Sequence, residues 1–154
     1  MNRANAHLTV ATVVEREGRF LMVREIAMGR EVINQPAGHW EPGETLEQAA
    51  IRETLEETAW HVELTGLIGV FLASSAPSEH YCRVAFAAKA INHDRVAAID
   101  EDILAAEWMS LDELHAQRDK MRSELVLQTL QAWLDGQCFD LSAVSSMPMV
   151  LTKP

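Results

Sequence analysis

Three glutamates on one predicted helix are the residues of this chain best suited to chemistry. Glu53, Glu56 and Glu57 stand at positions i, i+3 and i+4, so a helix would project their carboxylates from one face within about one turn. Three like charges this close destabilise a helix unless a cation neutralises them. Oxygen ligands on a compact face suit a hard divalent cation that also contacts substrate phosphates. An acidic helix face exposed to solvent has the same spacing, so the surrounding sequence has to decide.

Local signals around the glutamates predict where their helix begins and how it packs. Thr45 and Gln48 have the spacing of a capping box, which predicts a helix that runs to Thr58. Ile51 and Leu55 fall on the opposite side of that helix from the glutamates. We therefore expect these two side chains to pack on the core while the acids stay open to solvent.

The glutamates lie in a stretch that resembles the Nudix box, G-x5-E-x7-R-E-U-x-E-E-x-G-U, where U is aliphatic. Gly38, Glu44 and Arg52 occupy its other fixed positions. Two positions depart from the box. Thr54 replaces an aliphatic residue, which we expect to weaken packing, and Ala59 replaces the closing glycine, where left-handed backbone geometry favours glycine. Neither departure removes a carboxylate.

Three further segments, at 34–39, 107–110 and 121–123, look like the bacterial NudJ-type phosphatases of the Nudix superfamily; they read NQPAGH, EWMS and MRS. The resemblance implies an α+β fold, the Nudix α/β/α sandwich with a mixed, curved β-sheet. It implies metal-dependent hydrolysis of phosphoanhydride bonds in nucleoside tri- and diphosphates and related pyrophosphates. The alternatives are a housecleaning pyrophosphohydrolase of aberrant nucleotides or nucleotide sugars, and a Nudix module that senses a nucleotide without cleaving it. The intact carboxylates and arginine argue against the last.

The resemblance also implies roles for the residues of the box. Glu53, Glu56 and Glu57 would bind Mg²⁺, or alternatively Mn²⁺, and the Gly38 carbonyl would complete the site. Glu53 is also a candidate for the general base. We expect Arg52 to support the site through an ion pair with Glu56, four residues on, or with Glu44.

An additional acid is expected from outside the box. Asp102 stands six residues before Trp108, a spacing at which related sequences often carry an acid. It is therefore a candidate metal ligand and the rival to Glu53 as general base. Asp100 and Glu101 are neighbours that could replace it, and all three also fit an ordinary solvated loop.

Contacts with the substrate are expected from residues outside the acidic helix. The side chains of Arg24 and Arg30 could reach phosphates, and those of Asn34 and Gln35 could bind base or sugar edges. Trp40 is either a stacking surface for the substrate or a cover for the core.

Several neighbouring side chains are expected to play lesser parts. His39 follows the box glycine and is interpreted as a hydrogen-bonding support for the site. His80, Tyr81 and Arg83 follow a polar loop and are expected to be solvated at the surface.

Composition narrows the class of protein. A chain of 154 residues is most simply one domain, here with a core at about 7–139 and a C-terminal tail to 154. The net charge of −10 argues against binding nucleic acid. The resemblance implies that the partner is instead a small phosphorylated molecule, a nucleotide above all. Cys82 and Cys138 lack metal-ligand spacing and are interpreted as reduced thiols. With no signal peptide and no long apolar run, we expect a cytoplasmic protein without membrane contact, a monomer or a homodimer.

Hydrophobic patterning predicts the elements that position these residues. Apolar and β-branched segments predict strands at 7–15, 19–24, 32–35, 61–64, 67–73, 81–91 and 105–109. Loops are expected at 25–31 and 74–79. Besides the acidic helix, Ser110 is expected to cap a short helix and Ser123 to cap another at 124–134.

Overall fold

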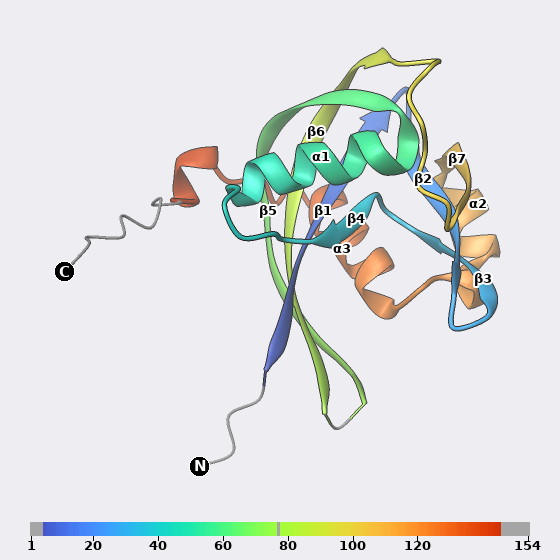
Figure 1. Ribbon diagram of the computed structural model, residues 1–154, viewed down its shortest axis with the longest axis horizontal. Coiled ribbons are helices and arrows are strands. Elements are labelled where there is room, and N and C mark those ends of the chain that lie inside the picture. Colours follow the sequence, from blue (N-terminus) through green and yellow to red (C-terminus); the bar gives the residue numbers. More distant parts are fainter. Residues whose placement is uncertain (1–4, 77, 146–154) are drawn as a thin grey trace.

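The computed structural model describes residues 5–76 and 78–145, and they form one mixed β-sheet with helices on both faces (Figure 1). The strand order is β3-β2-β1-β6-β5, with β4 also paired to β1 and β7 also paired to β2. The strands are β1 (Ala6–Arg16), β2 (Arg19–Ala27), β3 (Arg30–Asn34), β4 (Ala37–His39), β5 (Trp60–Ala76), β6 (Glu79–His93) and β7 (Ile103–Ser110). β1 and β6 run parallel, and the other pairs are antiparallel.

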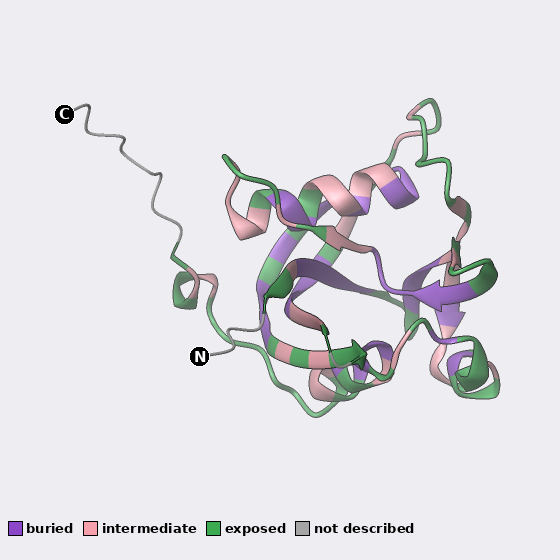
Figure 2. Ribbon diagram, turned by 60° about the horizontal axis from the view of Figure 1, so that its bottom comes forward, coloured by how far each residue is buried: buried purple, intermediate pink, exposed green. Residues whose placement is uncertain are grey.

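Helices cover both faces of this sheet. They are α1 (Leu46–Thr58), α2 (Leu111–Ala116) and α3 (Glu124–Leu134), with short 3₁₀ turns at Arg118–Lys120 and Leu141–Ala143. On one face Leu114 of α2 and Val126 and Leu130 of α3 join a buried apolar cluster with sheet residues. On the other face Ala49 and Ala50 of α1 join a second cluster. Figure 2 shows buried residues concentrated in the strands between these layers. The α/β/α sandwich expected from the sequence is confirmed.

Helix α1 begins and ends as its sequence predicts. Thr45 is the N-cap: its hydroxyl accepts a hydrogen bond from the Gln48 amide, and the Gln48 side chain accepts one from the Thr45 amide. At the other end Ala59 has φ of 57°, and its N–H donates to the Leu55 carbonyl. The position therefore has the left-handed geometry for which the box carries glycine, and alanine adopts it against its steric preference.

The side of α1 that packs on the sheet differs from the prediction. The buried residues are Ala49, Ala50, Thr54, Glu57 and Thr58, whereas Ile51 is 37% exposed. Small side chains and threonines let the helix lie close to the sheet. The acidic face therefore turns partly inward instead of staying open to solvent.

The threonine that departs from the box is accommodated by a polar contact. The hydroxyl of Thr54 lies 2.8 Å from that of Thr12 on β1, and it also donates to the Ala50 carbonyl at 2.7 Å. Both threonines are fully buried. A hydrogen-bonded pair thus fills the position where an aliphatic contact was expected.

Two predicted loops are instead strand hairpins. Only Met28 and Gly29 separate β2 from β3, and both have positive φ, so most of 25–31 is strand. At 74–79, β5 runs to Ala76 and β6 starts at Glu79. Pairing of Ser74 with His80 extends the hairpin, because cross-strand hydrogen bonds outweigh the polarity of the segment.

Other expectations fall close to the structure. The two strands expected at 61–64 and 67–73 are one strand, whose register shifts between Leu64 and Gly66 and between Leu67 and Gly69. Ser110 caps α2 through a capping box. Ser123 occupies the N-cap position of α3 without a side-chain capping bond.

Cys82 and Cys138 are free thiols. Within the described residues, no helix is long and apolar enough to cross a membrane. Residues 146–154 of the predicted tail lie outside the described part.

Candidate active site

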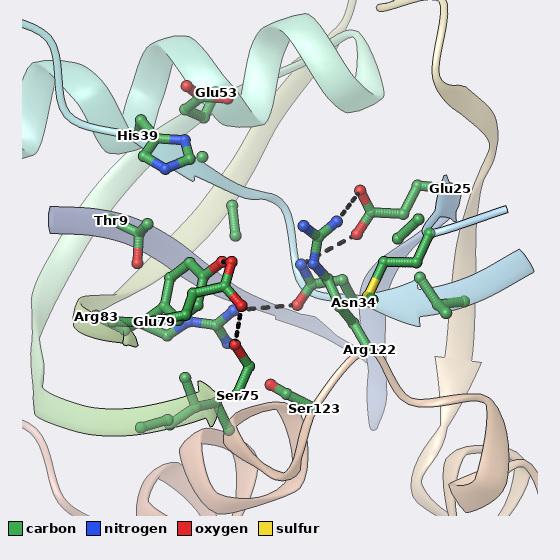
Figure 3. A pocket seen from close by; sticks show the side chains of 18 of the residues that line it. Thr9, Glu25, Asn34, His39, Glu53, Ser75, Glu79, Arg83, Arg122 and Ser123 are labelled. Atoms are coloured by element: carbon green, nitrogen blue, oxygen red, sulfur yellow. Dashed lines mark hydrogen bonds and ion pairs between the residues drawn. The ribbon is translucent and has the colours of Figure 1, made fainter. Parts of the chain in front are cut away.

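A cavity of about 630 Å³ lies beside α1 and collects many of the polar residues singled out above (Figure 3). Its lining comes from α1, from β4, from the β2–β3 and β5–β6 hairpins and from the start of α3. Glu53 and Glu57 face it from the helix, beside Gly38 and His39. A cavity of this size can enclose a nucleotide-sized molecule.

Glu57 is the most deeply buried of the three helix glutamates. It is 7% exposed, and its carboxylate accepts a hydrogen bond of 2.9 Å from the Ala37 amide. Burial raises the pKa of Glu57 to about 9, an effect that the Ala37 bond opposes and that the charges of Glu25 and Glu53 reinforce. In the described structure no Arg, Lys or His forms an ion pair with this carboxylate.

Glu53 lies against the backbone of the preceding loop. A Cβ added at Gly38 would collide with the Glu53 carboxylate, so this position accepts only glycine without a shift. Burial raises the pKa of Glu53, while an ion pair of 2.7 Å with Arg52 acts in the opposite direction. The box glycine thus allows the loop to approach the helix carboxylate.

Arg52 joins the carboxylates of the box into one network. Its guanidinium pairs with Glu44 at 2.7 Å, with Glu53 at 2.7 Å and with Glu56 at 3.0 Å. It also donates to the His39 carbonyl at 3.1 Å. These partners raise the pKa of Arg52. The expected ion pairs with Glu44 and Glu56 are confirmed, and Arg52 makes both at once.

Asp100, an acid of the loop before β7, interacts with the helix carboxylates from outside the box. Its amide donates to the Glu56 carbonyl at 3.0 Å. Burial, followed by the charges of Glu56 and Asp102, raises the pKa of Asp100. Its charge in turn raises the pKa values of Glu53 and Glu57. Asp102 is exposed, and its carbonyl accepts a hydrogen bond from Ile26.

The chemistry of this cluster fits a divalent cation. Several carboxylates affect one another's ionisation, and Arg52 is the one cation paired with them among the residues described. In their present positions, no three acidic, His or Cys side chains of residues 5–76 and 78–145 converge as metal ligands. A bound cation would have to draw the carboxylates away from Arg52. All donors are hard oxygens, and two are held partly desolvated, which suits Mg²⁺ or Mn²⁺.

The predicted substrate residues divide into two groups. Arg30 and Asn34 line the cavity. Arg24 lies outside the lining, and its guanidinium is bound to Glu107, Glu31 and Gln117.

Gln35 and Trp40 also lie outside the cavity lining. Gln35 is fully buried, and its amide donates to the Val126 carbonyl at 2.7 Å, so it links β3 to α3. Trp40 packs on the core and donates to the Glu44 carbonyl, which favours its role as a core cover.

A group of rings forms one wall of the cavity. His39 lies edge-on to His7, with ring centroids 5.4 Å apart, and His7 stacks on Tyr81 at 5.1 Å. Both His39 and Tyr81 line the cavity. Burial, and then electrostatic interactions with His7 and Arg122, lower the pKa of His39. Tyr81 is therefore part of the cavity wall, whereas simple surface solvation was expected.

Three charged residues line the cavity although the sequence did not predict them there: Glu25, Arg83 and Arg122. Arg83, expected at the surface, is 6% exposed. Glu25, expected in a loop, is 7% exposed on β2 and pairs with Arg122 at 2.7 Å. The alternation of side chains along a strand could have predicted that Arg83 is buried, because it places Arg83 on the same face of β6 as Ala85 and Ala87. The two alanines are in the buried cluster that packs against α2 and α3.

The sequence is similar to those of known proteins over most of its length. A family model described as the NUDIX domain matches residues 5–130. The chain is 34% identical over 147 residues to phosphatase NudJ of Escherichia coli (strain K12), an alignment that covers 96% of this chain and 95% of NudJ.

Solved structures show the same fold. A NUDIX hydrolase from Nitrosomonas europaea superposes with a TM-score of 0.92 at 33% identity, covering 94% of this chain and 99% of that protein. A bifunctional NMN adenylyltransferase/ADP ribose pyrophosphatase from Francisella tularensis, solved with AMP and a manganese ion, shares the fold at a TM-score of 0.64 and 23% identity, over 88% of this chain and 43% of that one.

Proposed function

Since the chain belongs to the Nudix family, whose members hydrolyse pyrophosphate bonds, we propose that its substrates are nucleoside tri- and diphosphates and related pyrophosphates, and that it requires Mg²⁺ or Mn²⁺. Enzymes of this family generally use divalent metal ions. The observation that carries the proposal is the pair Glu53 and Glu57, held partly desolvated at the cavity against Gly38 and Ala37. Similarity to NudJ over nearly the whole chain supports the substrate class.

Phosphoanhydride hydrolysis needs neutralisation of charge on the phosphate oxygens and a water in line with the leaving group. Glu53, Glu56 and Glu57, with the Gly38 carbonyl, would hold the cation, and the acidic loop would add Asp100 or Asp102. When bound, a divalent cation screens the phosphate charge and lowers the pKa of a coordinated water. The acidity of the protein is then compatible with a polyanionic substrate.

The chain's own residues have separate tasks in this scheme. Glu53 would accept the proton of the attacking water as general base, because its carboxylate lies at the cavity beside the Gly38 loop. Arg52 is a positioning residue that holds Glu53, Glu56 and Glu44 in one network. Arg30 would meet phosphate oxygens and Asn34 a base or sugar edge, since both line the cavity.

The decisive experiment is turnover with product analysis. Purified protein with Mg²⁺ or Mn²⁺ is incubated with nucleoside tri- and diphosphates, nucleotide sugars and the pyrimidine pyrophosphates of thiamin metabolism. Release of orthophosphate from both tri- and diphosphates is the expected, NudJ-like result. Pyrophosphate plus a monophosphate would favour the housecleaning alternative. Absence of turnover on every compound, with metal shown to be bound, would contradict the proposal.

A further inference from the structure

Arg83 is a buried cation without an acidic partner at the floor of the cavity. It is 6% exposed, yet it lines the cavity together with Glu53 and Glu57. Its guanidinium donates to two neutral amide oxygens, that of Gln35 at 3.0 Å and that of Asn34 at 3.3 Å. Among the described residues no carboxylate forms an ion pair with it, and its buried Nε has no hydrogen-bond partner.

The charges of Glu25 and Glu57 act on Arg83, but these carboxylates, like that of Glu79, make their hydrogen bonds with other residues. Glu25 pairs with Arg122 and accepts a hydrogen bond from Asn34. Glu79, the first residue of β6, accepts hydrogen bonds from the Tyr81 hydroxyl at 2.8 Å and from the Ser75 hydroxyl. The guanidinium groups of Arg83 and Arg122 thus share this part of the cavity, and Glu25 forms an ion pair with Arg122.

A buried charge of this kind is unfavourable unless something compensates it. Burial and the neighbouring Arg122 lower the pKa of Arg83 to about 10, although the charges of Glu25 and Glu57 partly oppose this, and Arg83 is still charged at neutral pH. Five N–H donors belong to a guanidinium, and only two of those on Arg83 have partners in the described structure. The amide oxygens of Asn34 and Gln35 fix the direction of the guanidinium without neutralising it.

We propose that Arg83, assisted by Arg122, is an anion subsite that binds the free terminal phosphate of the substrate, at the part of the cavity across from the α1 carboxylates. This inference rests on the proposed function and gives it a substrate class: diphosphates and triphosphates that end in an unesterified phosphate. Figure 3 shows the arrangement, with Glu53 beside α1 and the two arginines across the cavity from it.

The shape of the subsite selects a terminal group. Because so little of Arg83 is accessible, the group that reaches it has to be small and at the end of the molecule. A terminal phosphate is nearly dianionic at neutral pH and offers three oxygens, whereas a phosphate esterified on both sides carries one charge. Arginine binds such oxygens in a bidentate manner. Nucleotide sugars, whose diphosphate is capped at both ends, would lose this contact.

The test compares two non-hydrolysable analogues by calorimetry in Mg²⁺. One is an α,β-methylene nucleoside diphosphate with a free terminal group, and the other is the same compound esterified with ribose, as in ADP-ribose. Both carry the nucleobase of the best substrate in the turnover panel, or adenine if none is turned over. The proteins are the wild type, Arg83→Gln, Arg122→Gln and, as a matched surface control, Arg19→Gln, whose guanidinium pairs with Glu113 outside the cavity.

Arg83→Gln is expected to weaken binding of the analogue with the free terminal phosphate by roughly 10- to 100-fold. Binding of the esterified analogue should weaken by about threefold at most, because only the free terminal phosphate loses a charge-assisted hydrogen bond. Arg122→Gln should act in the same direction, because unpaired Glu25 would then attract Arg83. Arg19→Gln should change neither. Equal weakening of both analogues, or no change in either, would overturn the inference.

Two controls are needed to interpret the binding data: a test of folding and the preference of the wild type between the two analogues. A thermal melt checks folding, and if Arg83→Gln does not fold, Arg122→Gln decides by the same criterion. Failure of the wild type to bind the free analogue more tightly than the esterified one would also overturn the inference. Absence of turnover by the wild type bears on the proposed function, while selective binding bears on the subsite.

Discussion

The hydroxyls of Thr12 on β1 and Thr54 on α1 lie 2.8 Å apart in a fully buried layer of the molecule. This contact connects the helix that carries the box glutamates to the central strand of the sheet. It stands where the motif has an aliphatic residue, so a polar pair has taken over a packing role. Its energetic consequence is directly testable.

Thr54→Val is expected to destabilise the protein by about 1–3 kcal/mol, because it leaves the buried Thr12 hydroxyl without its partner. The double substitution Thr12→Val, Thr54→Val should recover most of that loss, since two apolar groups of similar shape can replace the pair. Urea unfolding of the single and double variants completes the cycle. Strictly additive losses would show that the two hydroxyls are not coupled.

Ala59→Gly should stabilise the protein. Alanine at φ of 57° has a steric penalty of about 1–2 kcal/mol that glycine avoids, although glycine loses more chain entropy on folding. The net gain is expected to be roughly 1 kcal/mol, or about 2–4 °C in Tm for a domain of this size. The matched control is Ala50→Gly inside α1, where φ is helical and the same change should destabilise. A lower Tm for Ala59→Gly would contradict the left-handed geometry.

The metal-free protein should lose stability as pH rises because of Glu57. Its pKa is raised from 4.5 to about 9 in the folded state. Between those values the unfolded chain has released this proton and the folded chain retains it, so the free energy of unfolding falls with increasing pH. Glu57→Gln removes this dependence, and its Tm should decline less than that of the wild type between about pH 5 and 9.

Glu57→Gln also tests whether Glu57 is a metal ligand or only a solvated surface residue. Mg²⁺ should raise the Tm of the wild type more than that of Glu57→Gln, and turnover at saturating Mg²⁺ should be largely lost in the variant. The amide preserves the shape of the side chain, so the fold is expected to remain intact. Turnover close to that of the wild type would remove Glu57 from the ligand set.

Glu53→Gln tests the general base. If Glu53 accepts the proton of the attacking water, kcat should fall by roughly 10²- to 10⁴-fold with little change in Mg²⁺ affinity. If Glu53 acts mainly as a ligand, affinity should fall and added Mg²⁺ should restore part of the rate. Asp102→Asn and Asp100→Asn are the matched comparisons. A large loss of kcat at either aspartate, with only an affinity change at Glu53, would assign the base to the acidic loop.

Much of the fold and of the helix was predictable because the signals are local. The capping pair Thr45 and Gln48 interacts within one turn, and strand patterning identified the strands on either side of α1. The spacing of the glutamates places their carboxylates on one side of any helix, whatever surrounds it. The ion pair of Arg52 with Glu56, four residues on, was foreseen for the same reason, whereas the pair with Glu44 was expected as an alternative to it from the motif.

Long-range packing set the properties that sequence spacing could not supply. Glu57 is desolvated because α1 packs on the sheet through its own alanines and threonines and turns its acidic face partly inward. Arg83 is buried on β6, an interior strand paired with both β1 and β5, whereas its polar neighbours in sequence suggested a surface position. Asp100 reaches the box through a hydrogen bond to Glu56, 44 positions earlier in the chain. The burial of Glu57 and Arg83 and the contact of Asp100 with Glu56 depend on residues distant in sequence, so only the tertiary structure decided the pKa shifts of these three groups.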